Sequence, residues 1–339
     1  MTAQDVIQLG RTSRPRTVLI ASSLEKDSNS VVGTGAAVAR AAGAKVYLVH
    51  VAPPEPFAVG LETGWLAPGA FKEEAERRRR LLWDQAKRLR IDPDELAGVG
   101  VTSGPPHWVI VETARRIGAE LIVVGASEFG RSLAKLLGST ADRVVRKASC
   151  PVLVVRGELP VPPRRVLMPV DLSELSADSF RCGLDLLGQI SNGAQAEIEA
   201  FYALDFLPPL EFCHPDMPWV TTSQQVERRA AWELERFVIE NGEDAPAAMH
   251  AKVQPGDARN EILSELERKS ADLVILGTHG RNGFDRLLLG SIASSVLRQA
   301  PCSVLMIPPA ATLGRAIAEA VVAQAVPNWH VEHPALARS

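Results

Sequence analysis

Short apolar runs alternate along this chain with longer segments whose apolar positions recur at helical spacing. Apolar runs bounded by turn residues predict buried strands, and apolar positions three and four residues apart predict helices. Strands that alternate with helices indicate an α/β fold with parallel sheets. The predicted strands lie near residues 17–22, 45–51, 98–103, 121–125, 152–156, 165–171, 196–203, 248–253, 273–277 and 303–307.

The same order of strands and helices occurs twice. Leu121–Gly125 matches Leu273–Gly277 at an offset of 152 residues. Near the front of each copy, Arg16–Ile20 matches Arg165–Pro169 at an offset of 149, which predicts an insertion of three residues in the second copy. Because self-similarity at a fixed offset is the signature of a repeated structural unit, we expect two copies of one fold.

Each copy predicts a five-stranded parallel sheet with helices on both faces. The length of 339 residues agrees with two domains of roughly 100–200 residues each. The proline-rich, polar segment 160–165 is the expected linker, and the alanine-rich segment 313–326 is a predicted helix that docks on the body or mediates assembly. The expected division is an N-terminal extension over 1–15, a first domain over 16–157, a second domain over 164–308 and a C-terminal tail over 309–339.

Composition and charge exclude several classes of protein. Hydrophobic residues make up 46% and charged residues 23% of the chain, which is an ordinary globular balance. A net charge of −3 gives no overall attraction to nucleic acid or to an anionic membrane surface. The one dense basic run, Arg77–Arg80, lies in a helical pattern and predicts a solvated helix face.

The cysteines and the N-terminus favour a cytoplasmic protein. The four cysteines lie far apart without Cys-x2-Cys spacing, which argues against a zinc ribbon and a disulfide framework and favours a reducing compartment. The first sixteen residues are polar, and no run approaches the roughly 18 apolar residues that span a bilayer. We therefore expect no membrane span.

Glycines follow the predicted strand 273–277 in a pattern suited to phosphate. Gly277 and Gly280 let main-chain N–H groups approach phosphate oxygens because no Cβ stands in the way. After nine further residues, Gly290-Ser291 begins a predicted helix whose unpaired N–H groups and positive dipole end favour an anion. Glycines that only turn the chain are the structural alternative, but the whole Gly-x2-Gly-x9-Gly-Ser pattern directly after a buried strand favours a nucleotide.

Both halves resemble the universal stress protein family, over about residues 15–157 and 164–308. The Gly-x2-Gly-x9-Gly-Ser pattern is similar to the ATP-binding signature of that family, and Val166–Glu174 is similar to its first strand and turn. The last strands, within 150–155 and 301–306, also resemble it. The resemblance implies a flavodoxin-like, adenine nucleotide alpha hydrolase-like fold for each copy, ATP as the ligand, and pairing of the domains around a pseudo-two-fold axis. A homodimer is also compatible with it.

The resemblance also implies roles for residues of the second copy. Asp171 would contact the adenosine or a Mg²⁺ ion beside the phosphates, and its structural alternative is a helix N-cap formed with Ser173. Pro169 and Ala203 would wall the adenine pocket, and Leu276 and Gly277 would border the ribose and the first phosphate. The phosphates would be held by His279, Gly280, Gly290, Ser291 and Ile292, with Arg281 as an added positive charge.

The first copy departs from this pattern. Ser22 stands where the second copy has Asp171, and Glu128 replaces Gly280. A carboxylate at that position repels phosphate oxygens, and its Cβ closes the approach to the main chain. Since Gly125 and Gly138-Ser139-Thr140 persist, the fold is kept while nucleotide binding by the first copy is predicted to be weak or absent.

Other chemistry has less support in the sequence. Polar residues cluster in the proline-rich segment 205–219 (Asp205, Glu211, Cys213, His214 and Asp216), but their spacing matches no known metal-ligand arrangement. Hydrolase and P-loop signatures are absent from the sequence. The leading interpretation is a stress-response protein in which nucleotide occupancy of the second domain regulates assembly or partner contacts. A slow ATPase or phosphotransferase, and a nucleotide-independent interaction module, are the alternatives.

Overall fold

A computed structural model of the chain describes residues 17–52, 70–126, 137–191, 196–205, 219–242, 249–280 and 289–309. The N-terminal extension, the loop 206–218, most of the C-terminal tail and the two predicted site positions Arg281 and Glu128 lie outside these ranges.

The predicted order of strands and helices is confirmed in both copies. In the first, the elements are β1 (Thr17–Ala21), α2 (Ser28–Ala42), β2 (Lys45–Ala52), α3 (Ala70–Arg88), β3 (Leu96–Ser103), α4 (Pro106–Arg116), β4 (Leu121–Gly125), α5 (Ser139–Lys147) and β5 (Val152–Val155). In the second, they are β6 (Arg165–Pro169), α6 (Glu174–Ser191), β7 (Glu197–Leu204), α7 (Trp219–Asn241), β8 (Met249–Pro255), α8 (Ala258–Lys269), β9 (Leu273–Gly277), α9 (Ser291–Gln299) and β10 (Ser303–Ile307).

The two five-stranded sheets join into one sheet of ten strands, in the order β3-β2-β1-β4-β5-β10-β9-β6-β7-β8. All pairs within a copy are parallel, whereas β5 and β10 pair antiparallel at the centre. Leu153 lies opposite Leu305, its own equivalent in the other copy. The two domains are therefore related by a pseudo-two-fold axis through this pair, and their sheet continues across the junction.

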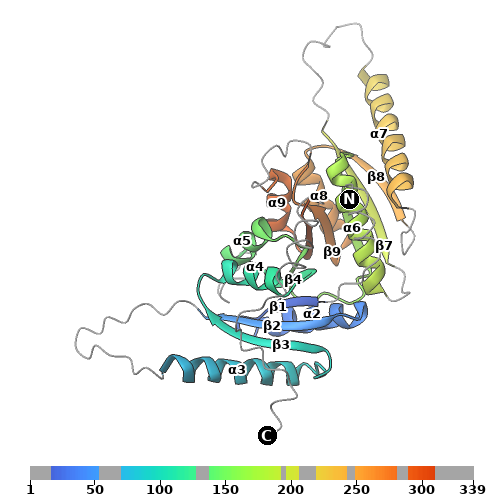
Figure 1. Cartoon of the computed structure of the whole chain (residues 1–339). Coiled ribbons are helices and arrows are strands. Elements are labelled where there is room, and N and C mark those ends of the chain that lie inside the picture. The colour runs from blue at the N-terminus through green and yellow to red at the C-terminus, as the bar shows by residue number, and fades with distance from the viewer. Residues whose placement is uncertain are drawn as a thin grey trace, which may run out of the picture.

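Helices cover both faces of the sheet, as expected for parallel strands that are apolar on both sides. One apolar core lies beneath α2, α3, α6 and α7, and a second lies beneath α4, α5, α8 and α9. Each core draws buried residues from both copies. Figure 1 shows α3 and α7 at opposite ends of the molecule, each beside an outer strand.

The strand registers correct the alignment of the two copies near their front ends. Val18 pairs with Leu121 in the first domain, and Val166 pairs with Leu273 in the second. Since Leu121 and Leu273 are equivalent, the offset here is 148 residues and not 149. The predicted insertion of three residues is therefore wrong by one, and the second copy gains four residues between its first helix and its second strand.

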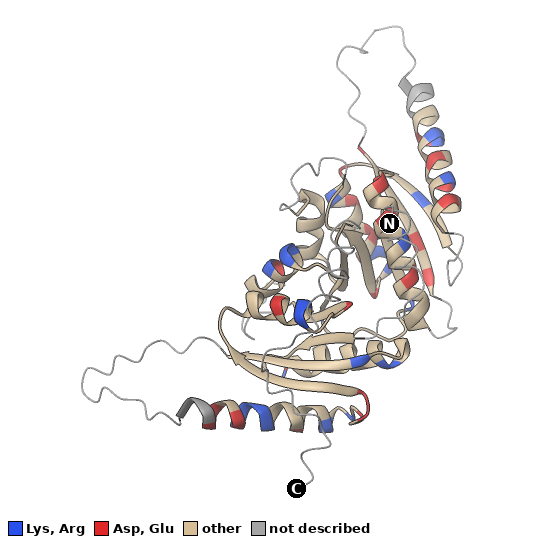
Figure 2. Cartoon of the chain, viewed as in Figure 1, with Lys and Arg blue, Asp and Glu red and all other residues tan. Residues whose placement is uncertain are grey.

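Charged residues of the described elements lie mainly on the helices. Figure 2 shows basic and acidic residues interspersed along α3 and α7, while the strands carry few charges. In α3, Arg77 and Arg78 both pair with Glu74, at 2.7 and 2.8 Å, as a solvated helix face predicts. Among the described helices, none is long and apolar enough to cross a membrane.

Candidate functional site

The glycine loop of the second domain begins at the carboxyl end of β9 and returns to the start of α9. Thr278 N donates a hydrogen bond to Ile307 O of the neighbouring strand, and Gly290 N donates to Thr278 O, both at 2.9 Å. These two bonds close the loop at its base. They also fix the first turn of α9 beside the end of the strand.

The first turn of α9 is built to leave main-chain donors open. Gly290 is the N-cap residue, with extended backbone angles of φ −54° and ψ 147°, and it has no side chain that could cap the helix. The turn that follows contains no acidic residue. Because N-terminal N–H groups and the helix dipole attract anions, this turn suits a phosphate or carboxylate group.

The glycines at the strand end have different reasons to be glycine. A Cβ on Gly277 would lie 2.5 Å from Ser179 Oγ of α6 and 3.2 Å from His279 O, so close packing against α6 and the loop favours glycine here. A Cβ on Gly280 would lie 2.6 Å from Asp171 Oδ2. Gly280 therefore lies close to the Asp171 carboxylate, and a side chain at this position would meet it.

Asp171 is held by the turn that leads into α6. Its Oδ1 accepts hydrogen bonds from Ser173 N at 3.0 Å and Ser173 Oγ at 2.5 Å, and Ser173 Oγ in turn accepts from Ser176 N at 3.2 Å. Ser173 is therefore the N-cap of α6, whereas Asp171 forms the preceding turn and directs its Oδ2 toward Gly280. The N-cap alternative applies to Ser173 and not to Asp171.

The donor set fits a nucleotide better than it fits a metal ion bound by protein alone. Within the described residues, no group of three or more histidine, cysteine, aspartate or glutamate side chains could hold a metal. A Mg²⁺ ion usually keeps several waters and binds through one or two carboxylates plus phosphate oxygens. Asp171 could supply one such carboxylate.

The other predicted phosphate contacts lie around the loop. His279 Nδ1 lies 2.8 Å from Thr278 Oγ1, which orients the imidazole next to Gly280. Ser291 is exposed at the start of α9, and Ile292 is 40% exposed beside it. The sequence predictions for these residues remain predictions, and Arg281 lies outside the described residues.

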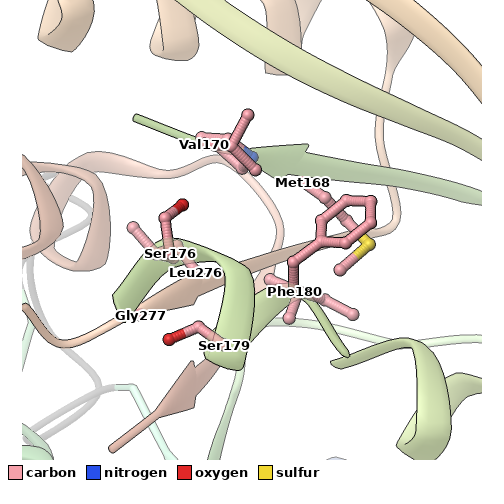
Figure 3. A pocket seen from close by; sticks show the side chains of 9 residues that line it. Met168, Val170, Ser176, Ser179, Phe180, Leu276 and Gly277 are labelled. Carbon is pink, nitrogen blue, oxygen red and sulfur yellow. The ribbon is translucent and has the colours of Figure 1, made fainter. Parts of the chain in front are cut away.

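A small pocket lies next to the loop, on the α6 side of the sheet (Figure 3). Its cavity volume is about 10 Å³, whereas small-molecule sites typically measure about 300–1,000 Å³. Figure 3 shows Phe180 and Met168 beside each other, with Ser176 and Ser179 on the same turn of helix. The lining residues are Met168, Pro169, Val170, Ser176, Ser179, Phe180, Ile275, Leu276 and Gly277.

Three residues predicted to surround the nucleotide, Pro169, Leu276 and Gly277, border this pocket. Ala203 does not, because it packs with the core beneath α8 and α9 on the opposite face. The pocket is thus adjacent to the loop and too small for a whole nucleotide. Ala203 lies on the face of the sheet that carries α9, and its predicted contact with adenine remains a prediction.

The first domain keeps the frame of this site. Ala126 N donates to Val155 O at 3.0 Å, and Gly138 N donates to Ala126 O at 2.7 Å, which repeats the two loop-closing bonds of the second domain. Gly138 is also an extended N-cap glycine, with φ −66° and ψ 149°. The first domain therefore keeps the backbone frame of the loop.

The residue equivalent to Asp171 is Ser23, and the prediction of Ser22 is wrong by one position. Leu24 and Leu172 have the same unusual backbone, with φ of 64° and 63°, and lie 148 residues apart. Ser23 Oγ accepts from Glu25 N at 3.3 Å, as Asp171 Oδ1 accepts from Ser173 N. The first copy thus keeps the turn and loses the carboxylate.

Ser22 belongs instead to a buried polar network that sequence reasoning missed. Its Oγ donates to Gln85 Oε1 at 2.7 Å, and Gln85 Nε2 donates to Ser28 Oγ and Asn29 Oδ1, both at 2.9 Å. The equivalent of Ser22 is Val170, and Phe237 replaces Gln85 in α7 at the offset of 152. Ser22 and Gln85 of the first domain therefore stand where the second domain has the apolar side chains Val170 and Phe237.

A second difference that sequence reasoning missed is the charge in the first turn of the helix that follows the loop. Asp142 of α5 corresponds to Ser294 of α9, which an alignment at the offset of 152 reveals directly. Burial alone would raise the pKa of Asp142, but a hydrogen bond from Arg146 and the charges of Arg146 and Arg298 lower it. Asp142 is therefore a fixed anion inside the first turn of the degenerate copy.

Comparisons with known proteins agree with this architecture. The chain is 26% identical over 320 residues to a universal stress protein of Mycolicibacterium smegmatis, covering 86% of this chain and 97% of that one. It is 28% identical over 273 residues to one of Mycobacterium tuberculosis, covering 76% and 85%. A solved universal stress protein of Archaeoglobus fulgidus has the same fold, with a TM-score of 0.60 at 17% identity over 86% of this chain and 96% of that one.

The family model described as "Universal stress protein family" matches residues 15–156 and 163–308, which is most of the chain in two consecutive copies. This chain therefore belongs to the universal stress protein family, as a member with two tandem domains.

Proposed function

We propose that this chain binds one ATP in its second domain, between the end of β9 and the start of α9. Occupancy of this site regulates the assembly of the protein or its contacts with a partner during stress. The observation that carries the proposal is the contrast between two copies on one frame. Both keep the loop-closing hydrogen bonds, but only the second has an aspartate opposite a glycine and an uncharged first helical turn.

The chemistry of the surrounding residues supports a phosphate ligand. The N–H groups of Ser291 and Ile292 lie at the positive end of the α9 dipole, and His279 adds a polar ring beside Gly280. Asp171 would contact the adenosine, or Mg²⁺ held mainly by the phosphates. Pro169, Ala203 and Leu276 would border the base and ribose, from the ends of β6, β7 and β9.

The first domain is proposed to bind nucleotide weakly or not at all. Ser23 supplies no carboxylate, and Asp142 already places a negative charge in the first turn of α5. Glu128 adds a second negative charge in the loop of that copy. Since like charges disfavour phosphate, this copy is proposed to act through its packing on the second domain.

A binding measurement on the full chain tests the site. Isothermal titration with ATP and Mg²⁺ should give about one nucleotide per chain. Gly280→Glu should abolish binding, because the new side chain meets Asp171 Oδ2 within 2.6 Å of the Cβ and brings a carboxylate to the phosphates. Glu128→Gln, at the equivalent position of the first domain, is the matched control and should leave both stoichiometry and affinity unchanged.

Unchanged ATP binding by Gly280→Glu would exclude this location of the site. The regulatory part of the proposal has its own measurement, which is sedimentation of the full chain with and without saturating ATP. The proposal requires that ATP change the sedimentation coefficient or the capture of a partner, and that Gly280→Glu remove this change. We also expect the protein in the cytoplasm, which imaging of a tagged full chain would test.

A further inference from the structure

Helix α9, whose N-terminus is proposed to bind phosphate, is called the phosphate helix below. Its last turn is held by Arg156 of the other domain. Arg156 follows β5, and its Nη2 donates to Leu297 O at 2.8 Å and to Arg298 O at 3.1 Å. Its main-chain N donates to Ser303 Oγ, at the start of β10, at 3.0 Å. A cation hydrogen-bonded to the final carbonyl groups of a helix satisfies them and complements the negative end of the helix dipole.

The first domain also contacts α9 near its other end. Arg146 Nη2 donates to Ser294 Oγ at 3.3 Å, while Arg146 Nε donates to Asp142 Oδ2 at 2.8 Å. Arg298 Nη2 lies 3.5 Å from Asp142 Oδ1. Helix α9 is thus held at both ends by side chains from the domain whose own nucleotide site is degenerate.

The contact of Arg146 with Ser294 has a counterpart, because Arg298 and Asp142 are the equivalents of these two residues at the offset of 152. The contact of Arg156 with the end of α9 has none. At the offset of 152 residues, the equivalent of Arg156 is Pro308, which has no side-chain donor for the carbonyl groups that end α5. The asymmetry runs from the degenerate domain toward the complete one. A general need to join the two domains would not require it, because the β5–β10 pairing already joins them symmetrically.

We propose that the first domain positions the phosphate helix of the second, with Arg156 as the main positioning residue. This inference rests on the proposed function. Helix α9 spans nine residues, or about 13 Å, so an anchor at its last turn and a contact at its first turn set where the N–H groups of its N-terminus point. Small displacements of such donors cost much of their interaction with a phosphate.

The coupling must also act in reverse. If contacts from the first domain raise the affinity for nucleotide, then bound nucleotide strengthens those contacts by the same free energy. Saturating ATP should therefore slow hydrogen exchange at the end of α9 and in β5. An effect of Arg156 on stability alone would leave this ATP-dependent change in place.

The test compares full-length variants by titration with MgATP, at a temperature where each is fully folded. Arg156→Ala should weaken ATP binding about tenfold, within the usual range of coupling between two sites. Arg156→Lys, which keeps the charge but not the planar fork, should restore affinity in part. Arg143→Ala, which removes an exposed arginine of α5, is the matched control and should bind as the unmodified chain does.

Hydrogen exchange on the same proteins supplies the second measurement. Arg156→Met keeps the aliphatic stem of the side chain and provides a folded variant if the alanine change prevents folding. In it, the ATP-dependent protection of β5 should be lost. Normal affinity in Arg156→Ala or Arg156→Met would overturn the positioning role alone, whereas no ATP binding by the unmodified chain would overturn the proposed function and this inference together.

Discussion

Asp171 and Gly280 lie against each other in the second domain, and the first domain replaces them with Ser23 and Glu128. These are changes of single side chains on a backbone that is otherwise repeated, with the same loop-closing hydrogen bonds. At the scale of residues, the two copies therefore differ in charge and in the space left by a missing Cβ. Both the charge and the missing Cβ affect how closely a phosphate group could approach the main chain.

Another residue-scale difference is a buried acidic pair in the second domain. Glu199 of β7 lies 2.9 Å from Lys269, and Glu265 of α8 lies 2.6 Å from Lys252 and also pairs with Arg268. Burial and a hydrogen bond with Glu265 raise the pKa of Glu199. Burial opposes ionisation of Glu265 too, but hydrogen bonds from Arg268, Glu199 and Lys252 lower its pKa to about 2.

The raised pKa of Glu199 predicts a loss of stability as pH rises. The stabilisation of the folded state by protonated Glu199 is fully present below the unfolded pKa of about 4.3. This stabilisation is lost as pH rises through the higher pKa of the folded state. The contribution of Glu265 has the opposite sign and is lost only as pH falls toward 2. Glu199→Gln should therefore raise the free energy of unfolding at pH 7, measured by urea denaturation.

The same variant should gain nothing at pH 4.5, where the native glutamate is already partly protonated. Glu197→Gln is the control, because Glu197 pairs with the same Lys269 at 3.1 Å but is exposed. An equal gain for Glu199→Gln at both pH values would contradict a role for ionisation.

At the scale of elements, glycines set how closely the first helix of each copy approaches the sheet. Gly35 of α2 and Gly183 of α6 occupy equivalent positions, 148 residues apart. A Cβ on Gly35 would lie 2.7 Å from Ile20 Cδ1, and one on Gly183 would lie 2.7 Å from Ile275 Cγ2. In the second domain, Gly183 therefore lets α6 pack close to the sheet. This packing also fixes the position of the turn before α6, which contains Asp171.

This packing predicts opposite effects for two neighbouring substitutions in α2. Gly35→Ala should destabilise the chain by about 1–3 kcal/mol because the methyl group overpacks the core against Ile20. Gly33→Ala meets only Leu89 Cδ2, at 4.0 Å, and should stabilise the helix by about 0.5–1 kcal/mol through its higher helix propensity. Thermal unfolding of both variants tests this, and a stabilising Gly35→Ala would show that α2 can shift outward at little cost.

At the scale of the whole molecule, one antiparallel strand pair unites two domains. β5 and β10 cover each other's edges, with Leu153 opposite Leu305 near the pseudo-two-fold axis. Both apolar cores continue across this junction, and α2 packs against α6 above it. The pairing also brings Arg156 to α9, so the contact proposed to position the phosphate helix exists only in the joined molecule.

Separation of the domains should expose two complementary strand edges. An isolated second domain, residues 164–309, is expected to form a homodimer through β10, because an uncovered edge strand pairs with another edge. Addition of an isolated first domain, ending at residue 158, should convert it to a one-to-one heterodimer that restores the β5–β10 pair. Sedimentation equilibrium distinguishes these species, and a second domain that stays monomeric at high concentration would contradict the prediction.

Much of this architecture was predictable from the sequence because it depends on local patterns. The ten strands follow from short apolar runs, and the loop before α9 follows from the spacing of Gly277, Gly280 and Gly290. The repeat itself follows from matches of sequence at one offset. Even the difference between Asp142 and Ser294 was open to an alignment of the chain with itself.

Only the tertiary structure decided which residues oppose one another. Strand register makes Ser23, and not Ser22, the equivalent of Asp171, because a backbone pairing has one alignment whereas a short sequence match tolerates a shift. The approach of Asp171 to Gly280, the Gln85 network and the contacts of Arg156 with α9 all join segments distant in the chain. Local periodicity determines the elements, and the packing of those elements determines which side chains meet.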